Sequence, residues 1–123
     1  MCGVFGIISK KSYEIQDLKK IVSHSTQRGK DSSGLIYMDS DKYQITRADF
    51  EINKLLKKTN PYNSKVVFGH SRLITNGLSD NQPLVKENIF VLHNGIITND
   101  KEIWDDLTVK RELQIDSEAI IGI

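Results

Sequence analysis

Cys2 is the only cysteine among the 123 residues of this chain, and its position near the N-terminus sets what its thiol could do. A lone cysteine is ordinarily a small buried hydrophobe, and that interpretation stays open here. Removal of Met1, however, would place a free α-amino group beside the Cys2 thiol. An α-amine has an ordinary pKa of about 7.7–8.0, so it can accept the thiol proton near neutral pH. Cys2 is therefore a candidate N-terminal nucleophile.

A thiolate that attacks a carbonyl needs hydrogen-bond donors for the negative charge that develops on the oxygen. Asn94 and Gly95 follow a predicted strand and offer a side-chain amide and a backbone N–H, so we interpret them as candidate oxyanion donors. The competing interpretation is an ordinary tight turn with positive φ, which Asn-Gly also favours.

Two charged residues could bind the charged groups of a small substrate. Arg72 follows a predicted strand, and its planar guanidinium can pair with a carboxylate through two hydrogen bonds. Asp116 could hold an ammonium group. The alternatives are a surface arginine and a carboxylate that caps the last helix. As a pair, the two residues match the charges of a free amino acid, which argues against an unrelated acyl hydrolase.

Composition and charge exclude several classes of protein. Hydrophobic residues make up 38% of the chain, which is enough for the modest core of a single domain. The 17 basic and 16 acidic residues give a net charge of +1, and the basic residues do not cluster as nucleic-acid binding would require. No run of 18 apolar residues predicts a membrane span. One cysteine and no secretory signal predict a cytoplasmic protein, and the three histidines lack metal-ligand spacing, so we expect no metal and no cofactor.

The apolar pattern predicts the elements that must position these residues. In the first half of the chain we expect a buried strand over residues 2–8, a helix over 14–26 and a hairpin over 33–38 with 43–48. Ile52, Leu55 and Leu56 then predict a short helix that is broken by Asn60-Pro61. In the second half we expect strands over 65–68 and 89–93, joined by a long loop over 71–83.

Two helices are expected near the C-terminus. Asn99 and Glu102 fit a capping box before a helix that contains Trp104, and a last helix begins at 116–118. The apolar residues that follow end abruptly at Ile123. We therefore expect residues 1–123 to form a single domain that is incomplete.

Six segments carry these candidate residues in one order along the chain: Cys2-Gly3-Val4-Phe5-Gly6-Ile7, Arg28-Gly29-Lys30-Asp31-Ser32-Ser33-Gly34, Gly69-His70-Ser71-Arg72-Leu73-Ile74-Thr75-Asn76-Gly77, Asn81-Gln82-Pro83, His93-Asn94-Gly95-Ile96-Ile97-Thr98-Asn99 and Asp116-Ser117-Glu118. In this order they resemble the class II glutamine amidotransferase domain of the N-terminal nucleophile hydrolases. That family includes the glutaminase domains of glucosamine-6-phosphate synthase, amidophosphoribosyltransferase and asparagine synthetase. The resemblance covers the whole chain but only about the first half of the family's domain.

The resemblance implies an α+β fold, a four-layer sandwich of two mainly antiparallel sheets between helical layers, of which this chain would form the first half. It implies roles for single residues as well: Cys2 as nucleophile, Asn94 and Gly95 as the oxyanion hole, Arg72 and Thr75 at the glutamine α-carboxylate, Asp116 at its α-ammonium group, and Arg28 and Asp31 in support behind the nucleophile. His70 and His93 are expected to be structural.

The implied reaction is hydrolysis of glutamine to glutamate and ammonia through a thioester on Cys2, with ammonia passing to a synthase domain that this chain lacks. Leu73 is more like asparagine synthetase, whereas the segment around Asn94 is more like glucosamine-6-phosphate synthase. The sequence therefore selects neither a subfamily nor an ammonia acceptor, and it leaves the oligomeric state open. The alternative is a non-catalytic glutamine-binding or structural fragment.

Overall fold

The computed structural model describes residues 2–73 and 81–123, which form an α+β fold with two antiparallel sheets. The α+β class and the antiparallel sheets expected from the sequence are confirmed. In chain order the elements are β1 (Gly3–Ile8), α1 (Ile15–Thr26), β2 (Ser32–Asp39), β3 (Lys42–Ala48), α2 (Ile52–Lys58), β4 (Val66–Arg72), β5 (Leu84–Lys86), β6 (Ile89–Val91), α3 (Asp100–Asp106) and α4 (Glu118–Gly122).

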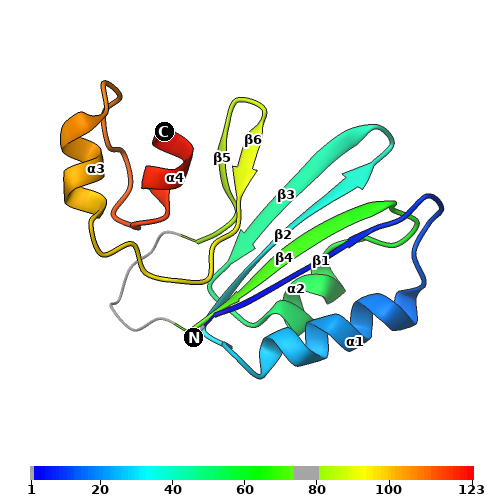
Figure 1. Cartoon of the computed structure of the whole chain (residues 1–123). Coiled ribbons are helices and arrows are strands. Elements are labelled where there is room, and N and C mark those ends of the chain that lie inside the picture. The colour runs from blue at the N-terminus through cyan, green and yellow to red at the C-terminus, as the bar shows by residue number, and fades with distance from the viewer. Residues whose placement is uncertain (1, 74–80) are drawn as a thin grey trace.

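The larger sheet has the strand order β1-β4-β2-β3, so β4 is paired on both sides (Figure 1). The register places Gly3 of β1 opposite Ser71 of β4. On the other side of β4, Ser32 of β2 lies opposite Arg72. The starts of β1 and β2 and the end of β4 therefore meet at one end of the sheet, and the candidate nucleophile Cys2 directly precedes β1.

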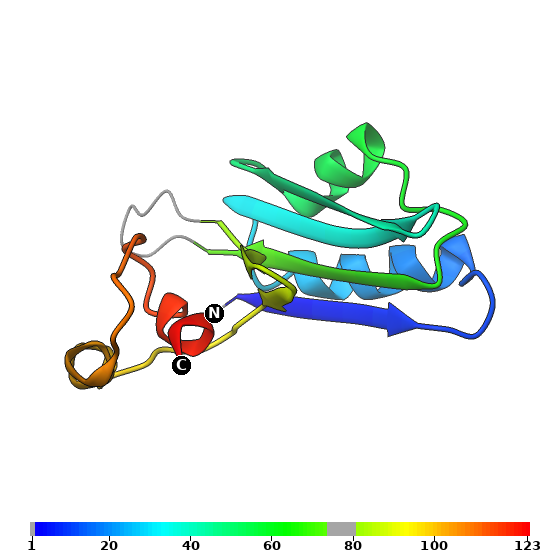
Figure 2. The ribbon, with the colours of Figure 1, turned by 90° about the horizontal axis from the view of Figure 1, so that it is seen from above.

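Both α1 and α2 cover the same face of this sheet (Figures 1 and 2). The side chains buried between the helices and the sheet alternate along each strand, as a half-buried sheet requires. They form one core cluster that contains Phe5, Tyr13, Leu18, Val22, Leu35, Tyr37, Ile52, Leu55, Leu56 and Val67. Burying an aliphatic or aromatic side chain of this size stabilises the fold by about 1.5–3 kcal/mol, so this cluster holds the sheet that carries Cys2 and Arg72.

The β5–β6 hairpin touches the opposite face of the larger sheet. The ring of Phe90 on β6 lies 5.5 Å from the ring of Phe68 on β4, measured between centroids, and 6.5 Å from the ring of Tyr43 on β3. Helices α3 and α4 follow the hairpin in the chain; α4 lies beside it, and α3 lies on the far side of α4 (Figure 1). No helix in the described part of the chain is long and apolar enough to cross a membrane.

Most elements expected in the first half of the chain are confirmed. The strand, the two helices and the β2–β3 hairpin lie within two residues of the predicted positions. Ser40 and Asp41, in the hairpin turn, have φ of 48° and 65°. Two successive positive φ values are those of a type I′ turn, which matches the twist of the flanking strands.

The second half of the chain differs from the expectations in two of its strands and at the start of α3. Strand β4 continues to Arg72 rather than ending at Phe68, because its polar residues pair with strands on both sides and are buried there. Strand β5 was not expected, since its three residues are too few to show a pattern. Asn99 stands at the N-cap of α3, yet its side chain makes no capping hydrogen bond, so the capping box is not formed.

Candidate functional site

Cys2 and Arg72 meet at the end of the larger sheet. Cys2 is half-buried, and it precedes the residue that pairs with Ser71, the neighbour of Arg72. Behind this point, the hydroxyl of Ser25 on α1 donates a 2.9 Å hydrogen bond to the Ser71 hydroxyl. Gly3 packs so tightly on α1 that a Cβ at this residue would lie 2.5 Å from the hydroxyl oxygen of Ser25. The backbone that carries Cys2 is therefore held firmly against α1.

A cavity of about 270 Å³ opens between this end of the sheet and the segments that flank α3. Four of the predicted site residues line it together: Cys2, Arg72, Gly95 and Asp116. These four residues thus border one space, although they come from positions up to 114 residues apart. The structure brings together the main groups that a thiolate reaction on an amino acid needs.

Arg72 is buried, with 8% of its surface exposed, so the alternative of a surface arginine is wrong. The loop that precedes β2 lies directly against its backbone. Gly29 is needed for this close approach, since a Cβ there would lie 2.4 Å from the Arg72 carbonyl carbon. The backbone N–H of Asp31 donates a 3.0 Å hydrogen bond to the Arg72 carbonyl oxygen. The exposed residue Asp31 thus supports Arg72 through its backbone rather than contacting the cavity.

Asp116 is half-buried and is held by the segment that follows Gly95. One carboxylate oxygen accepts a 2.6 Å hydrogen bond from the backbone N–H of Ile97. The other lies 3.4 Å from the Ser117 hydroxyl, which donates to it. Helix α4 receives no side-chain cap, so the alternative that Asp116 only caps this helix is wrong. Asp116 also lines the cavity.

The Asn94–Gly95 segment is not a tight turn. No positive φ is found at Asn94 or Gly95, and the residue with positive φ in the β5–β6 turn is Glu87, at 52°. Asn94 and Gly95 instead lie in an irregular segment between β6 and α3, and both are exposed. The expected positive-φ turn is therefore wrong, because the hairpin closes at the other end of β6.

Asn94 and Arg28 line a second cavity, of about 510 Å³, together with Gly3 and His24. Cys2 lines the first cavity and Gly3 the second, so the two cavities flank the start of β1. The structure thus separates the two predicted oxyanion donors, with Gly95 on the side of Cys2 and Asn94 on the other. Thr75 and Met1 lie outside the described residues.

Sequence reasoning gave no role to two polar residues that connect these segments. Gln82 and Ser117 are buried, with 3% and 1% of their surfaces exposed. Gln82 hydrogen-bonds to both the backbone N–H and the carbonyl of His93. The Ser117 hydroxyl lies 2.9 Å from Nδ1 of His93. The signal for Gln82 was its place in the Asn81-Gln82-Pro83 motif, but nothing in the sequence showed what its side chain contacts.

His70 is buried on β4 beside the site. Burial, which keeps water from solvating the charged imidazolium, and to a smaller extent the nearby Arg72 guanidinium together lower the pKa of His70 from 6.5 to about 4. His70 is therefore neutral at neutral pH. This agrees with the expectation that His70 is structural.

We expect the buried neutral His70 to make the fold less stable in acid. In the unfolded chain this imidazole takes up a proton near pH 6.5, whereas in the fold it does so only near pH 4. The stability of the fold is therefore undiminished by His70 above pH 6.5, and the free energy of unfolding falls as the pH drops toward 4. Between pH 7.5 and 4.5 the free energy of unfolding should drop by about 2–3 kcal/mol because of this group.

Urea unfolding of His70→Gln at several pH values tests this expectation, because the variant should show a shallower loss of stability in acid. His24→Gln is the matched control for the loss of an imidazole, since His24 is exposed on α1. Equal slopes of unfolding free energy against pH in the wild type and His70→Gln would show that folding does not lower the pKa of His70.

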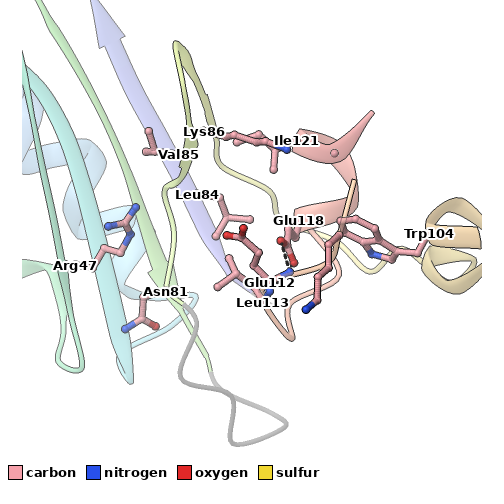
Figure 3. A pocket seen from close by; sticks show the side chains of 12 residues that line it. Arg47, Asn81, Leu84, Val85, Lys86, Trp104, Glu112, Leu113, Glu118 and Ile121 are labelled. Carbon is pink, nitrogen blue, oxygen red and sulfur yellow. Dashed lines mark hydrogen bonds between the residues drawn. The ribbon is translucent and has the colours of Figure 1, made fainter. Parts of the chain in front are cut away.

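A third cavity, of about 530 Å³, lies between the β5–β6 hairpin, α4 and Trp104 of α3 (Figure 3). It contains none of the predicted site residues. On its wall the Glu118 carboxylate accepts hydrogen bonds of 2.9 and 2.7 Å from the backbone N–H groups of Glu112 and Leu113. Glu118 thus fixes the loop that leads to Asp116.

Within residues 2–73 and 81–123, no group of three His, Cys, Asp or Glu side chains could hold a metal ion.

Similarity to known proteins agrees with this arrangement. The chain is 34% identical to glutamine–fructose-6-phosphate aminotransferase of Bartonella quintana, over 98% of this chain and 21% of that protein. It is 32% identical to the enzyme of the same name from Sulfolobus acidocaldarius, over 87% of this chain and 20% of that protein. The chain is a homologue of the class II glutamine amidotransferase domain. The resemblance identified from the six motifs is thereby confirmed.

The homology covers this chain well and its relatives only in part. The chain spans about a fifth of the length of the aminotransferases that it matches. It is also 31% identical to 7-cyano-7-deazaguanine synthase of Saccharolobus solfataricus, over 98% of this chain and 29% of that protein. No protein-family model matches the chain. The relatives thus carry different names, and the shared part is the region that contains the six motifs.

Proposed function

We propose that this chain carries the glutaminase site of an amidotransferase, with Cys2 as the nucleophile. The glutamine α-carboxylate would pair with Arg72 and its α-ammonium group with Asp116, leaving the side-chain amide beside the thiol. Thr75 would assist at the carboxylate. Attack by the thiolate forms a tetrahedral intermediate whose oxyanion accepts hydrogen bonds from Gly95 and Asn94.

Proton transfer and hydrolysis complete the proposed reaction. With Met1 removed, the α-amine of Cys2 takes the thiol proton and passes it to the leaving nitrogen. Ammonia departs and a γ-glutamyl thioester remains on the sulfur. Water then attacks the thioester, glutamate leaves and the thiol is restored.

The observation that carries this proposal is the shared cavity of Cys2, Arg72, Gly95 and Asp116. A binding pair of opposite charges beside a thiol fits a free amino acid better than a peptide or ester, because both termini are recognised. The relatives named as glutamine–fructose-6-phosphate aminotransferases act on glutamine, which is consistent with this pair.

The proposal extends to the partner and to the complete fold. Ammonia released at Cys2 would pass to a synthase domain or subunit, whose acceptor this sequence does not identify. The four-stranded sheet with its two helices would form one half of a four-layer sandwich. Arg28 and Asp31 would support the site from the loop that precedes β2.

Substitution of Arg72 by lysine tests the binding role. Arg72→Lys keeps the positive charge but removes the planar pair of donors, so the KM for glutamine should rise by about tenfold or more. Steady-state glutamine hydrolysis by the natural protein that carries this sequence would measure the effect. Lys10→Arg is the control for a conservative exchange of a cationic residue, because Lys10 is exposed beyond the far end of β1. An unchanged KM in Arg72→Lys would show that Arg72 does not bind glutamine.

A further inference from the structure

The side chain of Gln82 connects the two segments that would bind opposite ends of glutamine. Its Oε1 atom accepts a 2.5 Å hydrogen bond from the His93 backbone N–H. Its Nε2 atom donates at 3.1 Å to the His93 carbonyl oxygen and at 3.5 Å to the Ser117 hydroxyl. One buried amide thus holds both His93, which precedes Asn94, and Ser117, which follows Asp116.

The backbone around Gln82 is fixed to the larger sheet. Nδ2 of Asn81 donates a 2.7 Å hydrogen bond to Oδ1 of Asp49, which follows β3. Nε of Arg47 donates a 2.8 Å hydrogen bond to the Pro83 carbonyl oxygen. Between these contacts Gln82 crosses β2 at Gly34, where a Cβ would lie only 1.5 Å from the Gln82 carbonyl oxygen. The amide of Gln82 is therefore held by the same sheet that carries Cys2 and Arg72.

Ser117 continues the connection to Asp116. Its hydroxyl lies within hydrogen-bond distance of Gln82, of Nδ1 of His93 and of Oδ1 of Asp116. The second carboxylate oxygen of Asp116 accepts from Ile97, two residues beyond Gly95. The segment of the proposed oxyanion donors and the proposed ammonium-binding carboxylate are thus joined in a closed network.

We propose that Gln82 is a positioning residue that sets where the oxyanion donors and Asp116 stand relative to Cys2. This inference rests on the proposed glutaminase function. Gln82 does not act on the reacting atoms itself. It acts through the His93 backbone on Asn94 and Gly95, and through Ser117 on Asp116. A small displacement of such groups has a large effect on the rate, of order 10²-fold for about 1 Å.

The two routes from Gln82 predict different kinetic effects. Ser117→Ala breaks the route to Asp116 and removes the contact with the His93 ring, but it leaves both hydrogen bonds from Gln82 to the His93 backbone in place. It should therefore raise the KM for glutamine severalfold and leave kcat nearly unchanged. Gln82→Leu breaks both routes, so it should raise KM by a similar factor and lower kcat by about 10- to 100-fold. In the double variant the KM effects should not add, because both substitutions interrupt the same connection.

Stability must be separated from positioning. Gln82→Asn keeps the amide but is one methylene shorter, so it should reproduce the kinetic effect with a smaller loss of melting temperature. Ser64→Ala is the matched control, since Ser64 is buried and hydrogen-bonded at the other end of β4. It should lower the melting temperature without changing kcat or KM per folded molecule.

The test is glutamine hydrolysis by the natural protein and these variants, normalised to the folded fraction, together with backbone amide NMR spectra. The expected result is a fall in kcat for both Gln82 variants and shifted resonances of Gly95 and Ile97, which Ser64→Ala leaves in place. If kcat and KM per folded molecule in both variants match Ser64→Ala, the positioning role is overturned. If the wild type does not hydrolyse glutamine, the proposed function fails, whereas unshifted Gly95 and Ile97 resonances overturn the connection itself.

Discussion

Replacing Cys2 with serine should reduce glutamine hydrolysis by about 10³-fold or more, the largest effect expected of any substitution in this chain. Serine has nearly the same shape as cysteine, but its hydroxyl is a far weaker nucleophile than a thiolate. Because Cys2 is only half-buried, the melting temperature should change little. Release of ammonia and glutamate by the natural protein is the measurement.

Retention of Met1 should have a comparable effect, because the α-amine would then belong to the preceding residue and Cys2 would lose its base. Intact mass reports whether Met1 has been removed from each sample. Ser9→Ala, just beyond the far end of β1, serves as the control and should leave turnover unchanged. Full turnover by Cys2→Ser, or by a sample that keeps Met1, would contradict the N-terminal nucleophile.

The sequence predicted the first half of the fold well because its signals are local. The helical spacing of Leu18 and Val22 and the turn residues at Ser40 and Asp41 each determine an element without help from distant residues. Strand β4 was predicted too short, because His70, Ser71 and Arg72 are polar and owe their burial to two neighbouring strands. Such pairing depends on residues far away in the chain.

In the candidate site, too, the sequence predicted what local motifs determine and missed what long-range contacts determine. The motifs and the residue types predicted that Cys2, Arg72, Gly95 and Asp116 act together, and the structure gathers them around one cavity. The role of Gln82 could not be read from the sequence, because its partner His93 lies beyond the β5–β6 hairpin and its backbone path depends on the missing side chain of Gly34. Long-range contacts of this kind have no periodic signature.

Asn94→Ala should lower kcat for glutamine by about 10²–10³-fold and change KM much less. The reason is that an oxyanion donor meets full negative charge only in the tetrahedral intermediate, so its loss leaves substrate binding nearly intact. Asn94 lacks a positive φ, so alanine fits its backbone without strain. The substitution therefore removes the amide alone, and the melting temperature should stay close to that of the wild type.

The position of Asn94 makes this the most demanding test of the site. Asn94 lines the cavity on the far side of the start of β1, with Gly3 and Arg28, whereas Cys2 and Gly95 line the other. Its amide can stabilise the oxyanion only by reaching past the backbone of the nucleophile. Asn88→Ala, in the exposed turn between β5 and β6, is the matched control. If Asn94→Ala turns over glutamine as fast as Asn88→Ala, the oxyanion is held by Gly95 without Asn94, and the second cavity has no part in the reaction.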